Sequence, residues 1–344
     1  MGYATVDMDE KQNTNIEIFA FINMPENEFH TNDDIYRIRL YNIIDQLCDL
    51  SGKLESMFYD NNSEFIKVKL LNKKERRAKK IINNIKFDES KYEILRFSIK
   101  ISKKDHITDW SDEIIIHIFI KNIHELFIIA NICVLGSIDY SHSIIFCNNK
   151  ITDYNLDRID VWPLQRSVEL TKKIGWPKLD DINFFTAWNW FKKHDKYIDG
   201  FINNKTSRAI NAFSRIFSFY QFEWDESIIL LWSLIGIEAL YVEGRTTIME
   251  QVREKIYTLF GEPSSHKKII SDMYNFRSRF VHGDIDFPGF GFISDALEKY
   301  EKYADQQMDT VNIAIAILGS TLQYIIKNDW SGIKFSYAVS DRIE

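Results

Sequence analysis

From residue 206 to residue 328 the chain has apolar residues at helical spacing and none of the alternation that marks a β-strand. A helix with one apolar stripe must bury it against a neighbour, so several such helices in succession predict a helical bundle. We expect five helices, over residues 207–219, 226–242, 247–260, from 264 or 265 to 283, and, as one long or broken helix, 294–326. An all-α bundle over residues 205–330 follows.

Specific residues predict where these helices begin and end. Thr247, with Glu250 three positions later, is typical of a capping box at the start of the third helix. Ser264 or Ser265 is the expected N-cap of the fourth helix. Gly283 is expected to end that helix in the left-handed backbone conformation that glycine adopts easily.

Residues 1–190 mix the two periodicities and therefore predict an α+β domain. Segments 15–22, 65–71, 95–101 and 113–120 are expected to be strands, segments 34–50 and 124–135 helices, and segment 184–201 a connecting helix. A length of 344 residues suits two domains. We expect a regulatory or sensing domain over 1–190, a connecting segment over 191–204, the bundle over 205–330 and a C-terminal tail over 331–344.

The charge of the chain restricts how it can contact nucleic acid. A net charge of −7 and a pI near 5.7 exclude a protein that is basic over its whole surface, so any contact with RNA must be local. One concentrated basic run consists of Lys73, Lys74, Arg76, Arg77, Lys79 and Lys80. It is either a weak RNA-binding handle or a solvated surface segment.

Several classes of protein are disfavoured by missing signals. Cys48, Cys133 and Cys147 lack metal-ligand spacing and the N-terminus lacks a signal peptide pattern, which indicates a reduced, cytoplasmic protein. The apolar segments 114–138 and 313–326 contain polar residues or are short, so we expect no membrane span. Phosphate-loop, dinucleotide, zinc-protease and nucleophile-elbow motifs are absent, and we expect no metal and no cofactor.

Two segments of the predicted bundle stand out together. Residues 230–241 read LLWSLIGIEALY, and residues 274–283 read YNFRSRFVHG, in which Arg277 and His282 form an R-x4-H motif. In this order and at this separation the pair of segments resembles the ApeA-like HEPN family. The resemblance covers about a third of the chain and does not extend to residues 1–190.

That resemblance implies a function. Proteins of this family are toxin-type endoribonucleases of prokaryotic antiviral defence by abortive infection, and they cleave RNA without a metal as homodimers. Arg277 and His282 would be catalytic, and Glu238 and Ser278 would support them. Apart from the resemblance, the weaker candidates for RNA binding are Arg279 and, in the basic run, Lys73, Lys74, Arg76 and Arg77. The implied partners are RNA, a second copy of the chain, and a phage-derived trigger or a separate antitoxin.

The chemistry of Arg277 and His282 points the same way. A histidine with a pKa near 6.5 can remove the proton of an RNA 2′-hydroxyl, and an arginine stays charged and binds a phosphate through two hydrogen bonds. On a continuous helix the two side chains would lie roughly 140° apart, unless Gly283 ends the helix and lets His282 turn back.

Other interpretations of the same residues remain open. Arg277, Arg279 and His282 would also favour the negative end of a helix dipole without any catalytic role, and the bundle would then be a non-catalytic interaction or sensing module. Glu238 is the only charged residue between 228 and 242 and needs a partner, which is Arg277 if it belongs to the site and Arg245 or Arg253 if it forms a structural ion pair.

Overall fold

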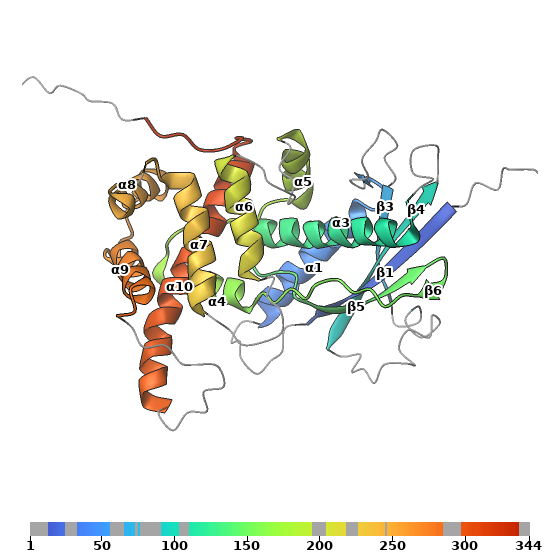
Figure 1. Ribbon diagram of the computed structural model, residues 1–344, viewed down its shortest axis with the longest axis horizontal. Helices are drawn as coiled ribbons and strands as arrows, with labels where there is room; N and C mark the ends of the chain where they lie inside the picture. Colours follow the sequence, from blue (N-terminus) through green and yellow to red (C-terminus); the bar gives the residue numbers. More distant parts are fainter. Residues whose placement is uncertain are drawn as a thin grey trace, which may run out of the picture. The chain divides into compact units, whose positions relative to one another are not determined.

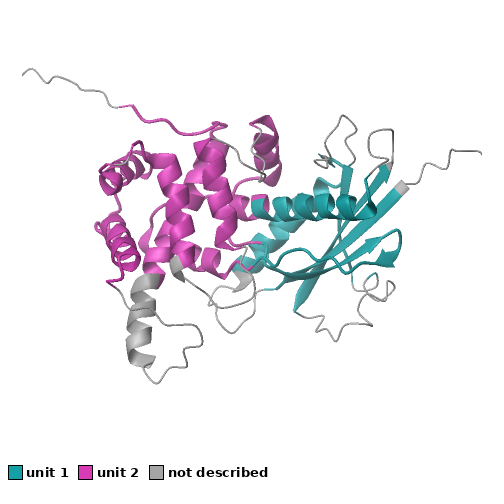
Figure 2. Cartoon of the chain, in the orientation of Figure 1, with its two compact units in different colours: residues 1–128, 138–159 teal, residues 129–137, 160–344 magenta. Residues whose placement is uncertain are grey.

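A computed structural model of the chain describes residues 13–24, 33–55, 65–72, 75, 91–102, 110–194, 204–217, 226–244, 246–284 and 297–336. The chain forms two compact units, which Figure 2 distinguishes by colour. Unit 1 comprises residues 1–128 and 138–159, and unit 2 comprises residues 129–137 and 160–344. The predicted fold class, α+β in the N-terminal half followed by helices, is confirmed at this level.

Unit 1 is built on a six-stranded antiparallel sheet with the strand order β2-β3-β4-β1-β5-β6. The strands are β1 (Asn13–Asn23), β2 (Leu54–Glu55), β3 (Phe65–Leu70), β4 (Tyr92–Ser102), β5 (Tyr140–Cys147) and β6 (Lys150–Ile151). The helices are α1 (Asp33–Asp49) after β1 and α3 (Asp112–Cys133) after β4. The element order β1-α1-β3-β4-α3-β5, with β4 and β1 central, is that of the split βαβ motif.

Three of the predicted strands and the helix over 34–50 are confirmed, but the strand predicted over 113–120 is wrong. These residues form the first turns of α3, which continues through the helix expected over 124–135. Ile115, Ile116, Phe119 and Ile123 are buried at helical spacing, and Asp112 and Glu113 favour the positive end of the helix dipole. The run of isoleucines suggested a strand because β-branched residues are common there.

Each strand of the sheet places alternate residues on a face covered by helices. Phe97 of β4 contacts Phe127 of α3, with ring centroids 5.6 Å apart. On the same side of β4, Glu93 accepts a hydrogen bond of 2.9 Å from the Tyr41 hydroxyl of α1. Both helices therefore pack against one face of the sheet, and Figure 1 shows α3 lying along it.

Unit 2 is helical. Its helices are α4 (Trp162–Ile174), α5 (Phe184–Lys193), α6 (Lys205–Ile216), α7 (Glu226–Tyr241), α8 (Ile248–Phe260), α9 (Ile269–Val281) and α10 (Leu297–Lys327), together with the last turn of α3. All five helices predicted for this part of the chain are present. The helix α4 and the strands β5 and β6 were not predicted.

Residues 160–190, which we expected in the first domain, belong to unit 2. The helix α4 buries Leu164 and Val168 and packs on α10. The helix α5 also packs on α10, and the indole of Trp190 donates a hydrogen bond of 2.8 Å to the carbonyl of Trp330. The apolar faces of α4 and α5 join these residues to the bundle.

The helix α10 is the centre of unit 2 and contacts α4, α5, α6, α7 and α9. Its stretch Met308–Lys327 is long and apolar enough to cross a membrane, but 83% of its most apolar window is buried inside the protein, as in the core helix of a bundle. Gly236 of α7 faces this helix, because an added Cβ would lie only 2.7 Å from a methyl group of Leu318. Close packing at Gly236 fixes α7, and with it Glu238, against the core.

Thr247 occupies the N-cap position of α8, as predicted, but it does not form the predicted capping box, and the N-caps predicted for α9 are wrong. Thr247 has a left-handed backbone, with φ of 52°, and its side chain makes no capping hydrogen bond. Gln251 instead donates to the Glu243 and Thr246 carbonyls. The residue preceding α9 is Lys268, so neither predicted serine caps it. A cap motif read from sequence assumes an extended backbone at the cap residue, and this loop does not supply it.

Candidate functional site

Glu238 of α7 lies beside Tyr274 and Arg277 of α9 within the bundle, where these helices contact each other. We call these residues the Glu238–Tyr274–Arg277 cluster. Three of their polar atoms are buried without a hydrogen-bond partner: Oε1 of Glu238, the hydroxyl of Tyr274 and Nε of Arg277. Because buried polar atoms are nearly always paired in folded proteins, three unpaired atoms in one place make this cluster the candidate site.

The electrostatics of the cluster follow from its burial. Burial raises the pKa of Glu238 above its ordinary value of 4.5, and the charge of Arg277 and the Tyr274 hydroxyl only partly offset this. Burial also raises the pKa of Tyr274, which is 8% exposed, and the Glu238 charge raises it further. The Tyr274 hydroxyl is thus close to the Glu238 carboxyl but does not have hydrogen-bonding geometry with it.

Of the two described arginines that we considered as partners of Glu238, Arg277 and Arg253, only Arg277 has a charge that acts on its carboxylate. Arg245 lies outside the described residues. Among the described residues, Arg277 forms no ion pair of 4.0 Å or less and no hydrogen bond through its side chain. The guanidinium is therefore half-buried beside Glu238 and retains N–H donors for an anionic ligand.

His282 follows the last residue of α9 and is exposed. Gly283 has φ of +76°, as predicted. The Asp284 amide donates a hydrogen bond of 2.8 Å to the carbonyl of Arg279, and the Gly283 amide donates one of 3.3 Å to the carbonyl of Phe280. Together these two bonds form a Schellman motif. The helix thus ends at His282, whose side chain forms no hydrogen bond, ion pair or ring contact with Arg277 or any other described residue.

The remaining predicted site residues lie apart from the cluster. Ser278 and Arg279 are exposed on α9, and their carbonyls accept the backbone bonds that end the helix. The predicted RNA-binding residues Lys73, Lys74, Arg76 and Arg77 lie outside the described residues. In the described ranges, no three His, Cys, Asp or Glu side chains gather as they would around a metal.

Tyr274 is the residue that sequence reasoning missed. Its position three residues before Arg277 places both on one side of α9, and that spacing was a usable signal. Comparison with known proteins adds no family: no family description, no curated protein and no solved structure matches this chain. A functional assignment therefore depends on the chemistry of these side chains.

Proposed function

We propose that unit 2 is a HEPN-type endoribonuclease that cleaves RNA without a metal, with Arg277 and His282 as catalytic residues. The observation that supports this proposal most is the state of Arg277. Its guanidinium is half-buried, stays close to Glu238 without an ion pair, and has donors that no described residue uses. A phosphate diester is the ligand that such a guanidinium binds best, through two parallel hydrogen bonds.

In this proposal the substrate supplies its own nucleophile. His282 removes the proton of the 2′-hydroxyl, whose oxygen attacks the adjacent phosphorus while the bond to the 5′ oxygen breaks. The leaving 5′ oxygen takes a proton from the protonated His282 of the second copy. Arg277 stabilises the negative charge that develops on the phosphate oxygens. The products are a 2′,3′-cyclic phosphate and a free 5′-hydroxyl. Ser278 and Arg279, exposed beside Arg277 in the sequence, would contact the RNA backbone.

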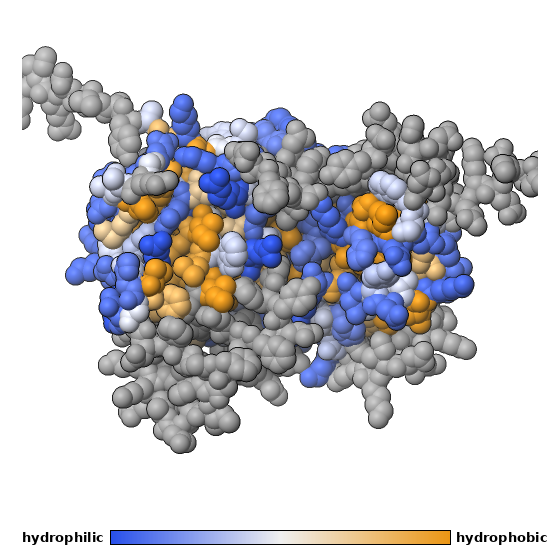
Figure 3. All heavy atoms as spheres, viewed as in Figure 1, coloured by the Kyte–Doolittle hydropathy of each residue, from blue (hydrophilic) through white to orange (hydrophobic). Residues whose placement is uncertain are grey.

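A complete site requires a second copy of the chain. Five positions separate Arg277 from His282, and the two side chains form no hydrogen bond with each other within one chain. The helix α7 carries an outward-facing apolar stripe at helical spacing, in which Leu231 and Trp232 are half-buried and Ile235 is 42% exposed. Figure 3 shows apolar side chains gathered on the surface over this helix. A two-fold contact through the bundle would cover the stripe and bring Arg277 and His282 of both copies into one cleft.

The biological setting is part of the proposal. A toxin-type ribonuclease of prokaryotic antiviral defence acts in the cytoplasm, and it must stay silent until a phage-derived trigger appears. Either unit 1 or a separate antitoxin would supply that control. If the full-length protein is harmless when expressed alone, control lies within the chain, whereas growth arrest without infection indicates a separate antitoxin.

The purified protein tests the chemistry directly. Once triggered or freed of its antitoxin, it should cleave RNA in excess EDTA and leave cyclic or 3′-phosphate ends with 5′-hydroxyls. Arg277→Ala and His282→Ala should each reduce the rate on the order of 10²- to 10⁴-fold. Arg208→Ala, at an exposed arginine of α6, is the matched control and should cleave normally. Cleavage by an Arg277→Ala/His282→Ala protein at the wild-type rate refutes the site, and absence of cleavage by the triggered wild type favours a non-catalytic module.

A further inference from the structure

The sheet of unit 1 has a second face, opposite α1 and α3. Since successive side chains alternate across a strand, this face carries Glu17, Phe19 and Phe21 of β1 and Arg96, Ser98 and Lys100 of β4. The register confirms the grouping, because Glu17 is directly opposite Ser98 and Phe19 directly opposite Arg96.

The two ends of this face differ. At the end near Phe21 it is apolar and buried, with Phe19, Phe21, Leu71 and Ile94 each at most 2% exposed. At the other end the side chains of β3 and β4 are accessible: Lys67 and Lys100 are exposed and the Lys69 side chain is 55% exposed. We call this accessible end the basic sheet surface, formed by Phe65, Lys67, Lys69, Arg96 and Lys100.

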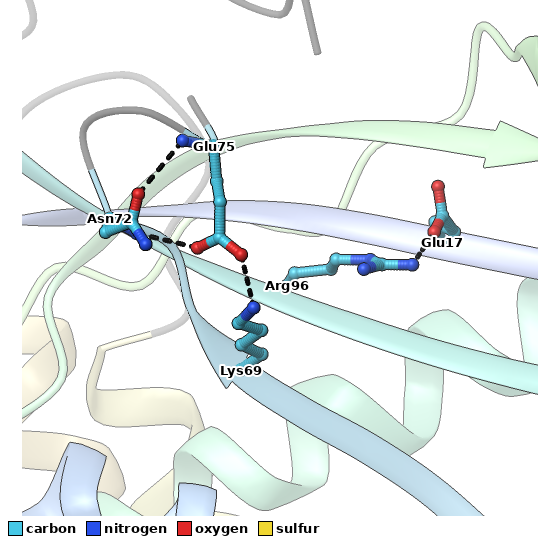
Figure 4. Close-up of polar contacts among 5 residues, drawn as sticks. All are labelled: Glu17, Lys69, Asn72, Glu75 and Arg96. Carbon is cyan, nitrogen blue, oxygen red and sulfur yellow. Dashed lines mark hydrogen bonds and ion pairs between the residues drawn. The ribbon is translucent and has the colours of Figure 1, made fainter. Parts of the chain in front are cut away.

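Two of the four cations on this surface are held in place by carboxylates, as Figure 4 shows. Arg96 forms an ion pair with Glu17, and Lys69 forms one with Glu75. Glu75 is itself fixed by Asn72, which exchanges two hydrogen bonds with it, of 3.0 and 3.1 Å. Lys69 and Arg96 are directly opposite in the register, so these acids relieve the repulsion between them.

The charge of the basic sheet surface is opposite in sign to that of the whole chain. Four cations against Glu17, Glu75 and Glu55, which is directly opposite Phe65 in the register, give a local charge of +1, while the chain carries −7. Two apolar side chains are exposed toward opposite sides of the face. Phe65 of β3 is 46% exposed, and Ile151 of β6, next to half-buried Phe146 of β5, is 62% exposed.

We propose that the basic sheet surface binds single-stranded RNA. The cations complement the charge of the phosphate backbone, and an exposed phenylalanine on the face of a sheet offers a ring on which an unpaired base stacks. A duplex is a poor fit, because its bases are already stacked and Phe65 would have nothing to contact. The choice of RNA over DNA rests on the ribonuclease proposed for unit 2. On this reading unit 1 recruits the RNA that unit 2 cuts.

The test measures binding separately from cleavage. The probe is a fluorescent oligouridylate with 2′-O-methyl groups, which cannot be cut through the 2′-hydroxyl, and the full-length protein is titrated by fluorescence anisotropy at several salt concentrations. Phe65→Ala should weaken binding about 5- to 150-fold, which corresponds to the loss of one stacked base. Lys67→Glu/Lys100→Glu should reduce the slope of log affinity against log salt by about 1.4, since each lost phosphate contact accounts for about 0.7.

Matched variants and a second probe give the outcomes that decide the proposal. Lys150→Glu makes one such substitution, half of the charge change, at an exposed lysine of β6. This lysine pairs with Cys147 on the helix-covered side of β5, and the variant should bind normally. Arg277→Ala should also bind this probe normally, so a failure of the ribonuclease would not hide this site. Wild-type affinity in the Lys67→Glu/Lys100→Glu protein, an equal loss in Lys150→Glu, or equal binding of a DNA oligonucleotide would overturn the proposal.

Discussion

Replacing Glu238 by Gln should stabilise unit 2 at neutral pH, because the cluster costs folding free energy. Burial raises the pKa of Glu238, so the ionised carboxylate is less favourable in the folded than in the unfolded chain. The stability that the protonated carboxyl contributes is complete below the unfolded-state pKa and is lost as pH rises through the higher folded-state pKa. Glu238→Gln retains the shape of the side chain and removes this loss.

The size of the Arg277 contribution can be bounded. The two charges are more than 4.0 Å apart, and at an effective dielectric constant of about 20 a pair at 4 Å interacts by about 4 kcal/mol, which is therefore an upper limit. Both side chains are only half-buried, so solvent screening reduces the interaction to about 1–2 kcal/mol. In a protein with Met at position 277 the carboxylate loses this favourable interaction, so Glu238→Gln should stabilise that protein by about 1–2 kcal/mol more than it stabilises the wild type.

Urea unfolding of four proteins measures this difference: wild type, Glu238→Gln, Arg277→Met and the double variant. The buried tryptophans Trp188 and Trp190 report on unit 2 by fluorescence. The effect of Glu238→Gln should disappear at pH values below the unfolded-state pKa, where both states bind the proton. Glu243→Gln, at an exposed carboxylate just after α7, should change stability by less than about 0.5 kcal/mol.

Two results would show that the reasoning about the cluster is wrong. If Glu238→Gln destabilises the protein at pH 7, the carboxylate is satisfied in a way that its burial and unpaired Oε1 do not indicate. If Glu238→Gln has the same effect with Arg277 and with Met, the two charges do not interact. Reduced RNA cleavage by the more stable Glu238→Gln protein would show that the cluster is kept for function.

Three further predictions concern α9. Gly283→Ala should destabilise unit 2 by about 1–2 kcal/mol in thermal unfolding, and Gly283→Asn by less, because no atom lies within 4 Å of the added Cβ and only the positive φ opposes the substitution. Gly175→Ala, at φ of +72°, should lose a similar amount of stability. Unchanged stability of the Gly283→Ala protein would contradict this prediction. Tyr274→Phe should keep its stability, since the hydroxyl has no partner, and lose about tenfold in RNA cleavage if that hydroxyl orients Arg277; normal cleavage would exclude the role. Mixing inactive Arg277→Ala and His282→Ala proteins should restore partial cleavage through a shared site, and a fully active monomer in sedimentation experiments would exclude such sharing.

Much of the fold could be predicted from sequence, because helices and strands repeat apolar residues with different periods. The strands β1, β3 and β4 show alternation, and α8 and α9 are each followed by a glycine, Gly261 and Gly283, that ends the helical pattern. The first turns of α3 could not be predicted, since Ile114, Ile115 and Ile116 fit a strand equally well and only packing decides. The short strands β2 and β6 carry too few residues to show any period.

The candidate site could be predicted in part. Glu238 was conspicuous as a lone charge on an apolar helix, but its partner depended on how α7 and α9 pack, which no local pattern records. Tyr274 resembled any other buried aromatic residue of α9. Tyr274 stands out because its buried hydroxyl has no hydrogen-bond partner, and this can be seen only in the folded structure.

The simplest alternative to catalysis is that the cations of α9 only stabilise the end of a helix. This alternative explains Arg279 and His282 but not Arg277. It suits Arg279, which lies in the last turn, and exposed His282, which follows it. It does not explain Arg277, which lies before the last turn and buries an unpaired Nε next to Glu238 and Tyr274. A residue kept for the helix dipole would be solvated. Burial of an unpaired Nε costs free energy, and the phosphate binding that we propose for Arg277 would offset this cost.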